Sequence, residues 1–243
     1  MPTIRLDIAY DGSGFHGYAR QPGLRTVQGE LDLAIEQVLS QGVDSSVAGR
    51  TDTGVHARGQ VVSFRADGEV EPDRLMRSLN GILGPEVAVN RVALAEDDFN
   101  ARFSARWRRY RYRLSLAPAP DPLTRGHVWH LGRSVDTRLM GETAEAFLGE
   151  LDFSAFCRSV EGKSNVRRVD ESHVAISGDQ LSFWIRANSF CHQMVRSLTG
   201  LIYDVGRGFV DLADVETIIE TRDRSVVATV APPHGLTLWE IGY

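Results

Sequence analysis

The alternation of apolar and polar residues near the start of the chain predicts a β-strand. Its apolar residues occupy every second position: Ile4, Leu6, Ile8 and Tyr10. From Thr26 the period lengthens, and the apolar residues fall on one face of a helix, with Thr26 as a suitable N-cap. These residues are Val27, Leu31, Ala34, Ile35, Val38 and Leu39. A strand followed by an amphipathic helix predicts an α/β or α+β unit.

The rest of the chain repeats this mixture of elements in both halves. The pattern predicts further strands at 60–66, 87–92, 107–116, 173–177, 181–187 and 236–243. It predicts further helices at 72–80, 137–151, 194–205 and 211–220. No repeat of fixed period is present. Because the two halves nevertheless carry a similar mixture of strands and helices, we expect two α+β lobes with a cleft between them. The expected lobes are 1–105 and 106–243, with a proline-rich connector at 117–122.

Residues 49–59, GRTDTGVHARG, form a predicted loop between two strands. Loops held by a rigid sheet often carry function. The residue types alone leave the role of this loop open. Asp52 beside threonine and glycine is typical of an Asx-turn or a helix cap. Arg50 is equally suited to a surface ion pair, and His56 to a hydrogen-bonded structural histidine.

The charge of the chain argues weakly against a nucleic-acid partner. Its formal net charge is 27 − 32 = −5, whereas nucleic-acid-binding proteins usually carry a basic surface. The cations are nevertheless unusual, because Lys163 is the only lysine. Guanidinium groups suit bidentate phosphate contacts, although a compositional bias towards arginine explains the same excess.

A basic segment lies within residues 102–113, and no acidic residue occurs between Asp98 and Asp121. In the predicted strand, Tyr110 and Tyr112 share one face, and three arginines share the other: Arg109, Arg111 and Arg113. This pattern fits an amphipathic strand with its tyrosines in the core. It also fits an aromatic stacking surface beside phosphate-binding guanidiniums.

Composition and cysteine content limit the other classes. The chain has 243 residues, 42% of them hydrophobic, which is enough for a sizeable core. We find no signal peptide and no run of apolar residues that could span a membrane, so we expect a soluble cytoplasmic protein. Cys157 and Cys191 have no metal-ligand spacing. We expect them to be reduced thiols with a structural role, and we expect no metal site.

The loop at 49–59 belongs to a longer string, GRTDTGVHARGQVVSF, which closely resembles the signature of the tRNA pseudouridine synthase A family. The resemblance extends in order over nearly the whole chain. The other blocks are IAYDGSGFHGYARQP with TVQGELDLAI, DDFNARFSARWRRYRYRL, ANSFCHQMVRSLTGLIYDVG and APPHGLTLWEIGY. It implies the pseudouridine synthase fold, in which two similar α+β lobes with largely antiparallel sheets meet at a central catalytic cleft.

The resemblance also implies an activity and its residues. The activity is isomerisation of uridine to pseudouridine at positions 38–40 of tRNA, without a cofactor, by a homodimer. Asp52 is the implied catalytic residue. Three routes are open to its carboxylate: attack on C1′ of ribose, attack on C6 of uracil, or removal of a ribose proton to give a glycal. Arg50 is expected to position the carboxylate and fill the gap left by a flipped base, and Tyr110 to stack on that base. Leu236 is either a wall of the substrate pocket or a core residue, and Tyr112 is expected in the core. The implied phosphate contacts are Arg102, Arg106, Arg108, Arg109, Arg111, Arg167, Arg168 and Arg196.

The chain departs from the family pattern in two places. Tyr18 and Ala19 replace a tryptophan and a glutamine, and Gln193 stands where many relatives have a histidine. Both changes concern loop contacts and substrate range, and they leave the reaction itself unchanged. Two other functions remain open: a non-catalytic RNA-binding protein on the same fold, and a glycosidic hydrolase. A hydrolase usually needs two carboxylates, and the nearest pair, Asp97 and Asp98, has the pattern of a solvated loop.

Overall fold

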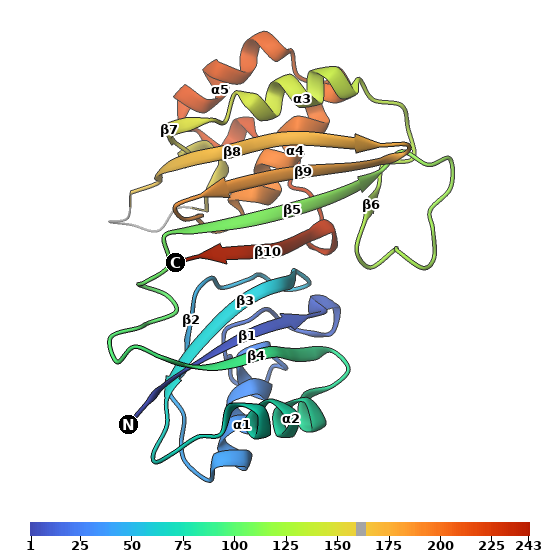
Figure 1. Ribbon diagram of the computed structural model, residues 1–243. Helices are drawn as coiled ribbons and strands as arrows, with labels where there is room; N and C mark the ends of the chain where they lie inside the picture. Colours follow the sequence, from blue (N-terminus) through green and yellow to red (C-terminus); the bar gives the residue numbers. More distant parts are fainter. Residues whose placement is uncertain (159–163) are drawn as a thin grey trace. The chain divides into compact units, whose positions relative to one another are not determined.

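A computed structural model describes residues 1–158 and 164–243, so Lys163 lies outside the described residues (Figure 1). The chain divides into two compact units. Unit 1 comprises Met1–Arg106 together with Thr237–Tyr243, and unit 2 comprises Trp107–Leu236. The limits expected from sequence, 1–105 and 106–243, did not include this return of the final strand to unit 1.

Unit 1 is a sheet with two α-helices. Its elements are β1 (Thr3–Tyr10), η1 (Gly12–Gly14), α1 (Val27–Leu39), β2 (Ser46–Val47), β3 (His56–Arg65), α2 (Pro72–Leu83), β4 (Val87–Ala95) and most of β10 (Leu236–Gly242). The strand order is β4-β1-β3-β10, with β2 also on β3. The β1, β2 and β4 pairings are antiparallel, whereas β10 runs parallel to β3. The expected mixture of strands and helices is therefore present.

The core of unit 1 follows from the alternation that predicted β1. Ile4, Leu6 and Ile8 are fully buried. In register they lie opposite Phe64, Val62 and Gln60 of β3. Thr26 caps α1 as expected, because its hydroxyl accepts a hydrogen bond of 3.2 Å from the Gly29 amide.

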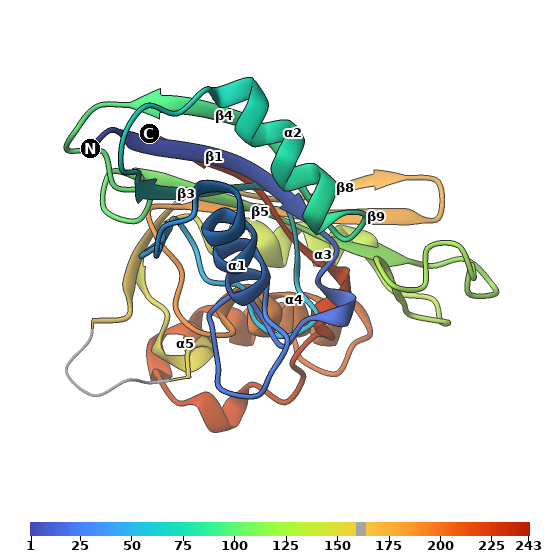
Figure 2. The ribbon, with the colours of Figure 1, turned by 90° about the horizontal axis from the view of Figure 1, so that it is seen from below.

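Unit 2 is a largely antiparallel sheet with its helices gathered on one side (Figures 1 and 2). Its elements are β5 (Trp107–Ser115), β6 (Trp129–His130), α3 (Thr137–Glu145), β7 (Gly149–Asp152), η2 (Ser154–Phe156), β8 (Val166–Ser177), β9 (Gln180–Ala187), α4 (Met194–Gly206), η3 (Leu212–Asp214), α5 (Val215–Thr221), η4 (Arg224–Val226) and η5 (Pro233–Gly235). The strand order is β5-β9-β8-β7, and β6 runs parallel to β5.

The two faces of β5 differ in burial. Tyr110 and Tyr112 are buried, and they lie opposite Ile185 and Phe183 of β9, which are also buried. The alternate arginines of β5 are only partly buried. The Tyr112 hydroxyl donates a 2.7 Å hydrogen bond to the Pro232 carbonyl, which satisfies its only polar atom. The strand is therefore amphipathic, and Tyr112 is a core residue as expected.

Several predicted element boundaries are wrong. The strand expected at 173–177 already begins at Val166. The helix expected at 137–151 ends at Glu145, and the short strand β7 begins at Gly149, which has a φ of 105°. The loop expected at 49–59 is shorter, since β3 already begins at His56. The helix expected at 211–220 starts as the 3-10 turn η3, and α5 begins only at Val215.

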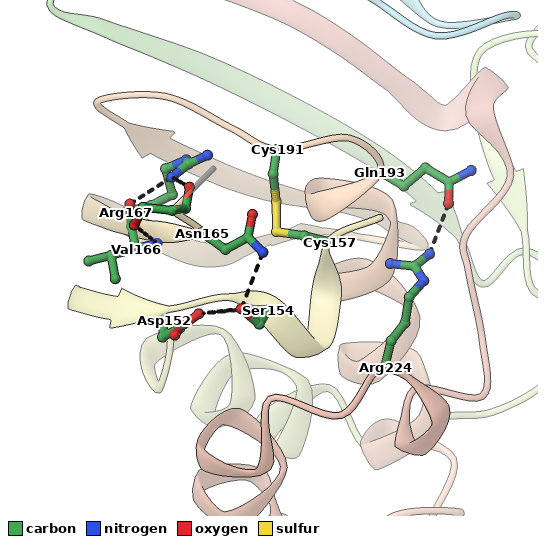
Figure 3. The surroundings of a disulfide bond; sticks show 10 residues. Asp152, Ser154, Cys157, Asn165, Val166, Arg167, Cys191, Gln193 and Arg224 are labelled. Atoms are coloured by element: carbon green, nitrogen blue, oxygen red, sulfur yellow. Dashed lines mark hydrogen bonds between the residues drawn. A yellow bond between two sulfur atoms is a disulfide. The ribbon is translucent and has the colours of Figure 1, made fainter. Parts of the chain in front are cut away.

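The expectation that both cysteines are reduced is also wrong. Cys157 and Cys191 form a disulfide, with their Cα atoms 5.6 Å apart (Figure 3). They are 34 residues apart in sequence, but the antiparallel pairing of β8 and β9 turns the chain back on itself between them. Spacing along a chain gives no information about such a close approach. Next to the disulfide, the Gln193 amide oxygen accepts a 2.8 Å hydrogen bond from Arg224.

Among the described residues, no helix is long and apolar enough to cross a membrane.

Candidate active site

The segment from Gly49 to Val55 connects β2 to β3 and carries Asp52 at its centre. The Asp52 side chain is half-buried, and Arg50 is exposed. The Val55 amide donates a 3.1 Å hydrogen bond to the Asp52 carbonyl, which closes a tight turn. Gly54 in this turn has a φ of 75°, a conformation that glycine adopts without strain. In this segment Arg50 is therefore open to solvent, and Asp52 is partly so.

A buried polar network lies beneath this segment. The Gln60 amide nitrogen donates to the Gly49 carbonyl at 2.6 Å, and its amide oxygen accepts from the Gly49 amide at 3.3 Å. The same nitrogen donates to the Tyr10 hydroxyl at 3.3 Å. That hydroxyl lies 2.7 Å from the Thr51 hydroxyl. Gln60 is fully buried, and Tyr10 and Thr51 are nearly so. The two residues that flank Arg50 are thus tied to the core of unit 1.

The burial of Tyr10 fixes its protonation. Burial raises the pKa of Tyr10 to about 12, and its hydrogen bonds with Thr51 and Gln60 only partly offset this effect. The hydroxyl therefore keeps its proton at neutral pH. Because it accepts from Gln60, it can donate that proton to the Thr51 oxygen.

The block that follows β1 packs directly against the Asp52 segment. The Tyr18 amide donates a 3.0 Å hydrogen bond to the Thr51 carbonyl. The Gly12 amide donates to Nδ1 of the buried His56 at 3.0 Å, and the same nitrogen lies 3.1 Å from a carboxylate oxygen of Asp11. At Gly12 a side chain would collide with the Val55 carbonyl. Two of the sequence blocks therefore meet in one compact arrangement within unit 1.

In unit 2, Tyr110 is held by aromatic packing. Its ring lies edge-on to Phe190, with ring centroids 5.0 Å apart, and its side chain is 8% exposed. Leu236, the first residue of β10, is also buried, at 6% exposed. A buried leucine at this position is compatible with both alternatives, a core residue and an apolar wall of the substrate pocket.

The expected phosphate-binding arginines differ in what they already contact. Arg109 forms a 2.6 Å ion pair with Glu171 and lies 4.4 Å above the ring of Trp184. Arg111 donates two hydrogen bonds to the Ser182 hydroxyl, and Arg108 donates to the Asn188 carbonyl. These guanidiniums have partners within the fold, which reduces what remains for a phosphate.

The remaining arginines of the expected set lie in other settings. Arg102, Arg106 and Arg168 are exposed. The half-buried Arg167 donates to the carbonyls of Ser164 and Val166. Arg196 on α4 donates a 2.8 Å hydrogen bond to the Ala231 carbonyl. The exposed guanidiniums are therefore the ones best placed to meet a polyanion.

Sequence reasoning did not identify Tyr10 and Gln60. A signal for Gln60 was present, because it shares the inward face of its strand with Val62 and Phe64. A polar residue at a position where the alternation demands an apolar one needs hydrogen-bond partners in the core. Tyr10 gave no such signal, since a tyrosine at the end of an apolar alternation is typical of a core strand.

The segment that follows β1 and the Asp52 segment both lie within the residues matched by a known protein family. The family described as tRNA pseudouridine synthase matches residues 8–104 and 143–243. The chain belongs to the tRNA pseudouridine synthase family. Its members are isomerases, and membership confirms the expected fold class, that of the pseudouridine synthases.

Individual relatives match over the whole chain. The chain is 42% identical over 249 residues to tRNA pseudouridine synthase A of Cutibacterium acnes, with 100% of this chain and 89% of the relative covered. It is 43% identical over 249 residues to the Streptomyces griseus protein of the same name, with 99% and 87% covered. A solved Cbf5-Nop10-Gar1 complex aligns with a TM-score of 0.36 and 13% identity, over 82% of this chain and 53% of that one. At that level the structural match carries no argument.

Proposed function

We propose that this protein isomerises uridine to pseudouridine in tRNA, with Asp52 as the catalytic nucleophile. Membership in the family supports the reaction. The observation that carries the assignment of Asp52 is its position: a half-buried carboxylate in a loop whose flanking backbone is bonded to the core. A carboxylate fixed in this way can meet a reacting atom without losing further conformational freedom.

The reaction requires little besides such a group. The bond between N1 of uracil and C1′ of ribose breaks, and a bond between C5 and C1′ forms. The proton on C5 leaves and N1 gains one, so the atoms balance without an oxidant or a reductant. A nucleophilic carboxylate divides this exchange into two easier steps by forming a covalent intermediate. The target base must first leave its stack, which costs a few kcal/mol.

Three other residues complete the proposal. Arg50 fills the gap left by the flipped nucleotide and positions the Asp52 carboxylate, and its exposed side chain supports the first role. Tyr110 contacts the target base, and Leu236 contributes an apolar wall. Among the arginines, exposure favours Arg102, Arg106 and Arg168 as phosphate contacts.

The finer parts of the proposal concern the substrate position and the assembly. We assign the modified uridines to positions 38–40 in the anticodon arm, and the working form to a homodimer. Both assignments rest on the family resemblance. Mapping pseudouridines in tRNA treated with the purified protein tests the first, and light scattering of the purified protein tests the second.

The decisive experiment replaces Asp52 with asparagine, which keeps the size of the side chain and removes its charge. We expect Asp52→Asn to bind tRNA normally and to lose at least about 10³-fold in tritium release from tRNA labelled at C5 of uridine. Asp98→Asn is the matched control, because Asp98 is an exposed acid on another loop. It is expected to retain wild-type activity.

The same assay separates the other functions. Turnover of Asp52→Asn near the wild-type rate would remove Asp52 from its role. A wild-type protein that binds tRNA but releases no tritium would be a non-catalytic binder. Release of free uracil without pseudouridine would identify a hydrolase.

A further inference from the structure

The buried polar network of unit 1 ends at the two residues on either side of Arg50. Gln60 engages both backbone polar atoms of Gly49, and Tyr10 engages the side chain of Thr51, the residue immediately before Asp52. Each contact approaches the segment from the core side. The network therefore acts on the backbone of the segment that presents the proposed nucleophile.

We propose that Tyr10 is a positioning residue for isomerisation, acting through the Thr51 hydroxyl, with Gln60 holding Gly49 on the other side of Arg50. This inference rests on the proposed function, because it deepens the role of the same loop. We name Tyr10, Gln60 and Thr51 the loop clamp.

The bonding of Gln60 fixes the orientation of its amide within the loop clamp. An amide that donates to the Gly49 carbonyl and accepts from the Gly49 amide has only one orientation that satisfies both bonds. Its nitrogen then also faces the Tyr10 hydroxyl. The Tyr10 hydroxyl, which keeps its proton because it is buried, can then donate to the Thr51 oxygen. The contacts thus form a continuous chain from Gln60 through Tyr10 to Thr51.

Stability alone does not require this arrangement. Apolar side chains of the same shape can replace a buried hydrogen-bonded pair at nearly equal stability. Hydrogen bonds add fixed distances and angles, which matter for a loop that lies outside the strand ladder. A displacement of about 1 Å at a reacting group can cost about 10²-fold in rate. Holding the segment still is therefore a contribution to the reaction.

The test removes one oxygen atom. We expect Tyr10→Phe to fold, to bind tRNA with a KM within about twofold of wild type, and to lower kcat by about 10- to 100-fold. Thr51→Val removes the other hydroxyl and is expected to lower kcat similarly. Thr51→Ser keeps the hydroxyl and is expected to restore most of the rate. The double variant Tyr10→Phe/Thr51→Val is expected to match the single variants, because both break the same bond.

The chain offers a matched control in Tyr18. This tyrosine is fully buried and its ring lies 6.2 Å from that of Tyr10. Within the described residues its hydroxyl has no hydrogen-bond partner. Tyr18→Phe therefore removes the same atom from the same core without removing a bond, and we expect its kcat to be unchanged.

A second measurement keeps the inference separate from the proposed function. Hydrogen exchange follows the amides of Gly49 and Val55, whose bonds hold the segment. We expect both to exchange faster in Tyr10→Phe and to stay as in wild type in Tyr18→Phe. If the wild-type protein releases no tritium, the proposed function fails, and the exchange rates alone decide about the loop clamp.

The remaining outcomes overturn the inference. Wild-type exchange and wild-type kcat in Tyr10→Phe would show that the hydroxyl positions nothing. A fall in melting temperature with kcat unchanged would show a purely structural role. Additive losses in the double variant would show that Tyr10 and Thr51 act independently.

Discussion

Asp52 in unit 1 and Tyr110 in unit 2 are held in place by different forces. Asp52 lies on irregular backbone, and the residues around it are bonded to Gln60 and Tyr10. Tyr110 lies in the ladder of β5, opposite Ile185. Its ring packs against Phe190, the residue before the disulfide-bonded Cys191. Polar contacts dominate in the first region, and apolar and covalent contacts dominate in the second.

The difference follows from the backbone that each residue occupies. In a strand, the pleat already sets the direction of a side chain, so packing is enough to hold it. A loop has no ladder, and its direction must come from side chains that reach its backbone groups. We therefore expect the loss of single polar atoms to disturb the Asp52 region. We expect the Tyr110 region to be disturbed by lost packing or by loss of the nearby disulfide between Cys157 and Cys191.

The largest expected effect on stability comes from the disulfide. Cys157→Ala/Cys191→Ala, or reduction of the wild-type protein, frees a loop that spans 34 residues. Chain entropy predicts a loss of about 4 kcal/mol in the free energy of unfolding. Guanidinium chloride unfolding with and without a phosphine reductant measures it, and the double variant, which has no thiols, serves as the control. If the reductant left the unfolding midpoint of the wild-type protein unchanged, the claim that the disulfide stabilises the Tyr110 region would be contradicted.

A smaller loss of stability is expected from a change at Gly12, where the segment that follows β1 packs against the Asp52 segment. Gly12→Ala places a methyl group against the Val55 carbonyl, and we expect it to lower the free energy of unfolding by about 3 kcal/mol. Gly81→Ala in α2 is the control, because within the described residues nothing lies within 4 Å of the added carbon. It is expected to raise stability by about 0.5–1 kcal/mol. Equal effects of both variants in thermal melts would argue against close packing at Gly12.

The smallest expected effect is on the salt dependence of tRNA binding, and it distinguishes the exposed Arg106 from the ion-paired Arg109. Arg106→Gln is expected to lower the slope of log affinity for tRNA against log salt by about 0.7–0.9, the value for one phosphate contact. Arg109→Gln/Glu171→Gln removes an ion pair with no net charge, so we expect the slope to stay the same. Filter binding at several salt concentrations measures both. A larger change for the paired residue would show that Arg109 exchanges Glu171 for a phosphate.

The apolar periodicity of the sequence predicted most of the fold, because a strand or helix that is buried on one face must carry apolar residues at regular intervals. β1, α1 and β5 have the expected types and nearly the expected limits. The predicted helix at 137–151 was too long, because its apolar pattern continues past Glu145, where the helix ends, into the short strand β7. The short strands β2, β6 and β7 are too brief to produce a pattern.

The sequence predicted which loop carries the candidate site, but not which side chains contact that loop. The string around Asp52 identified the loop, yet nothing in the spacing indicated that Tyr10, Thr51 and Gln60 would meet. Their contacts join residues up to 50 positions apart, through the register of β1 with β3. The arginines of β5 were visible in the sequence as positive charges. Only the structure shows that Arg109 already forms an ion pair with Glu171.

The final strand has a consequence for how the chain is made. Thr237 and Leu238 pair with His56 and Ala57, directly after the Asp52 segment. On the ribosome, the first 106 residues emerge long before this strand exists, so one edge of their sheet stays open while all of unit 2 is synthesised. Unit 1 is completed last, although most of it is translated first.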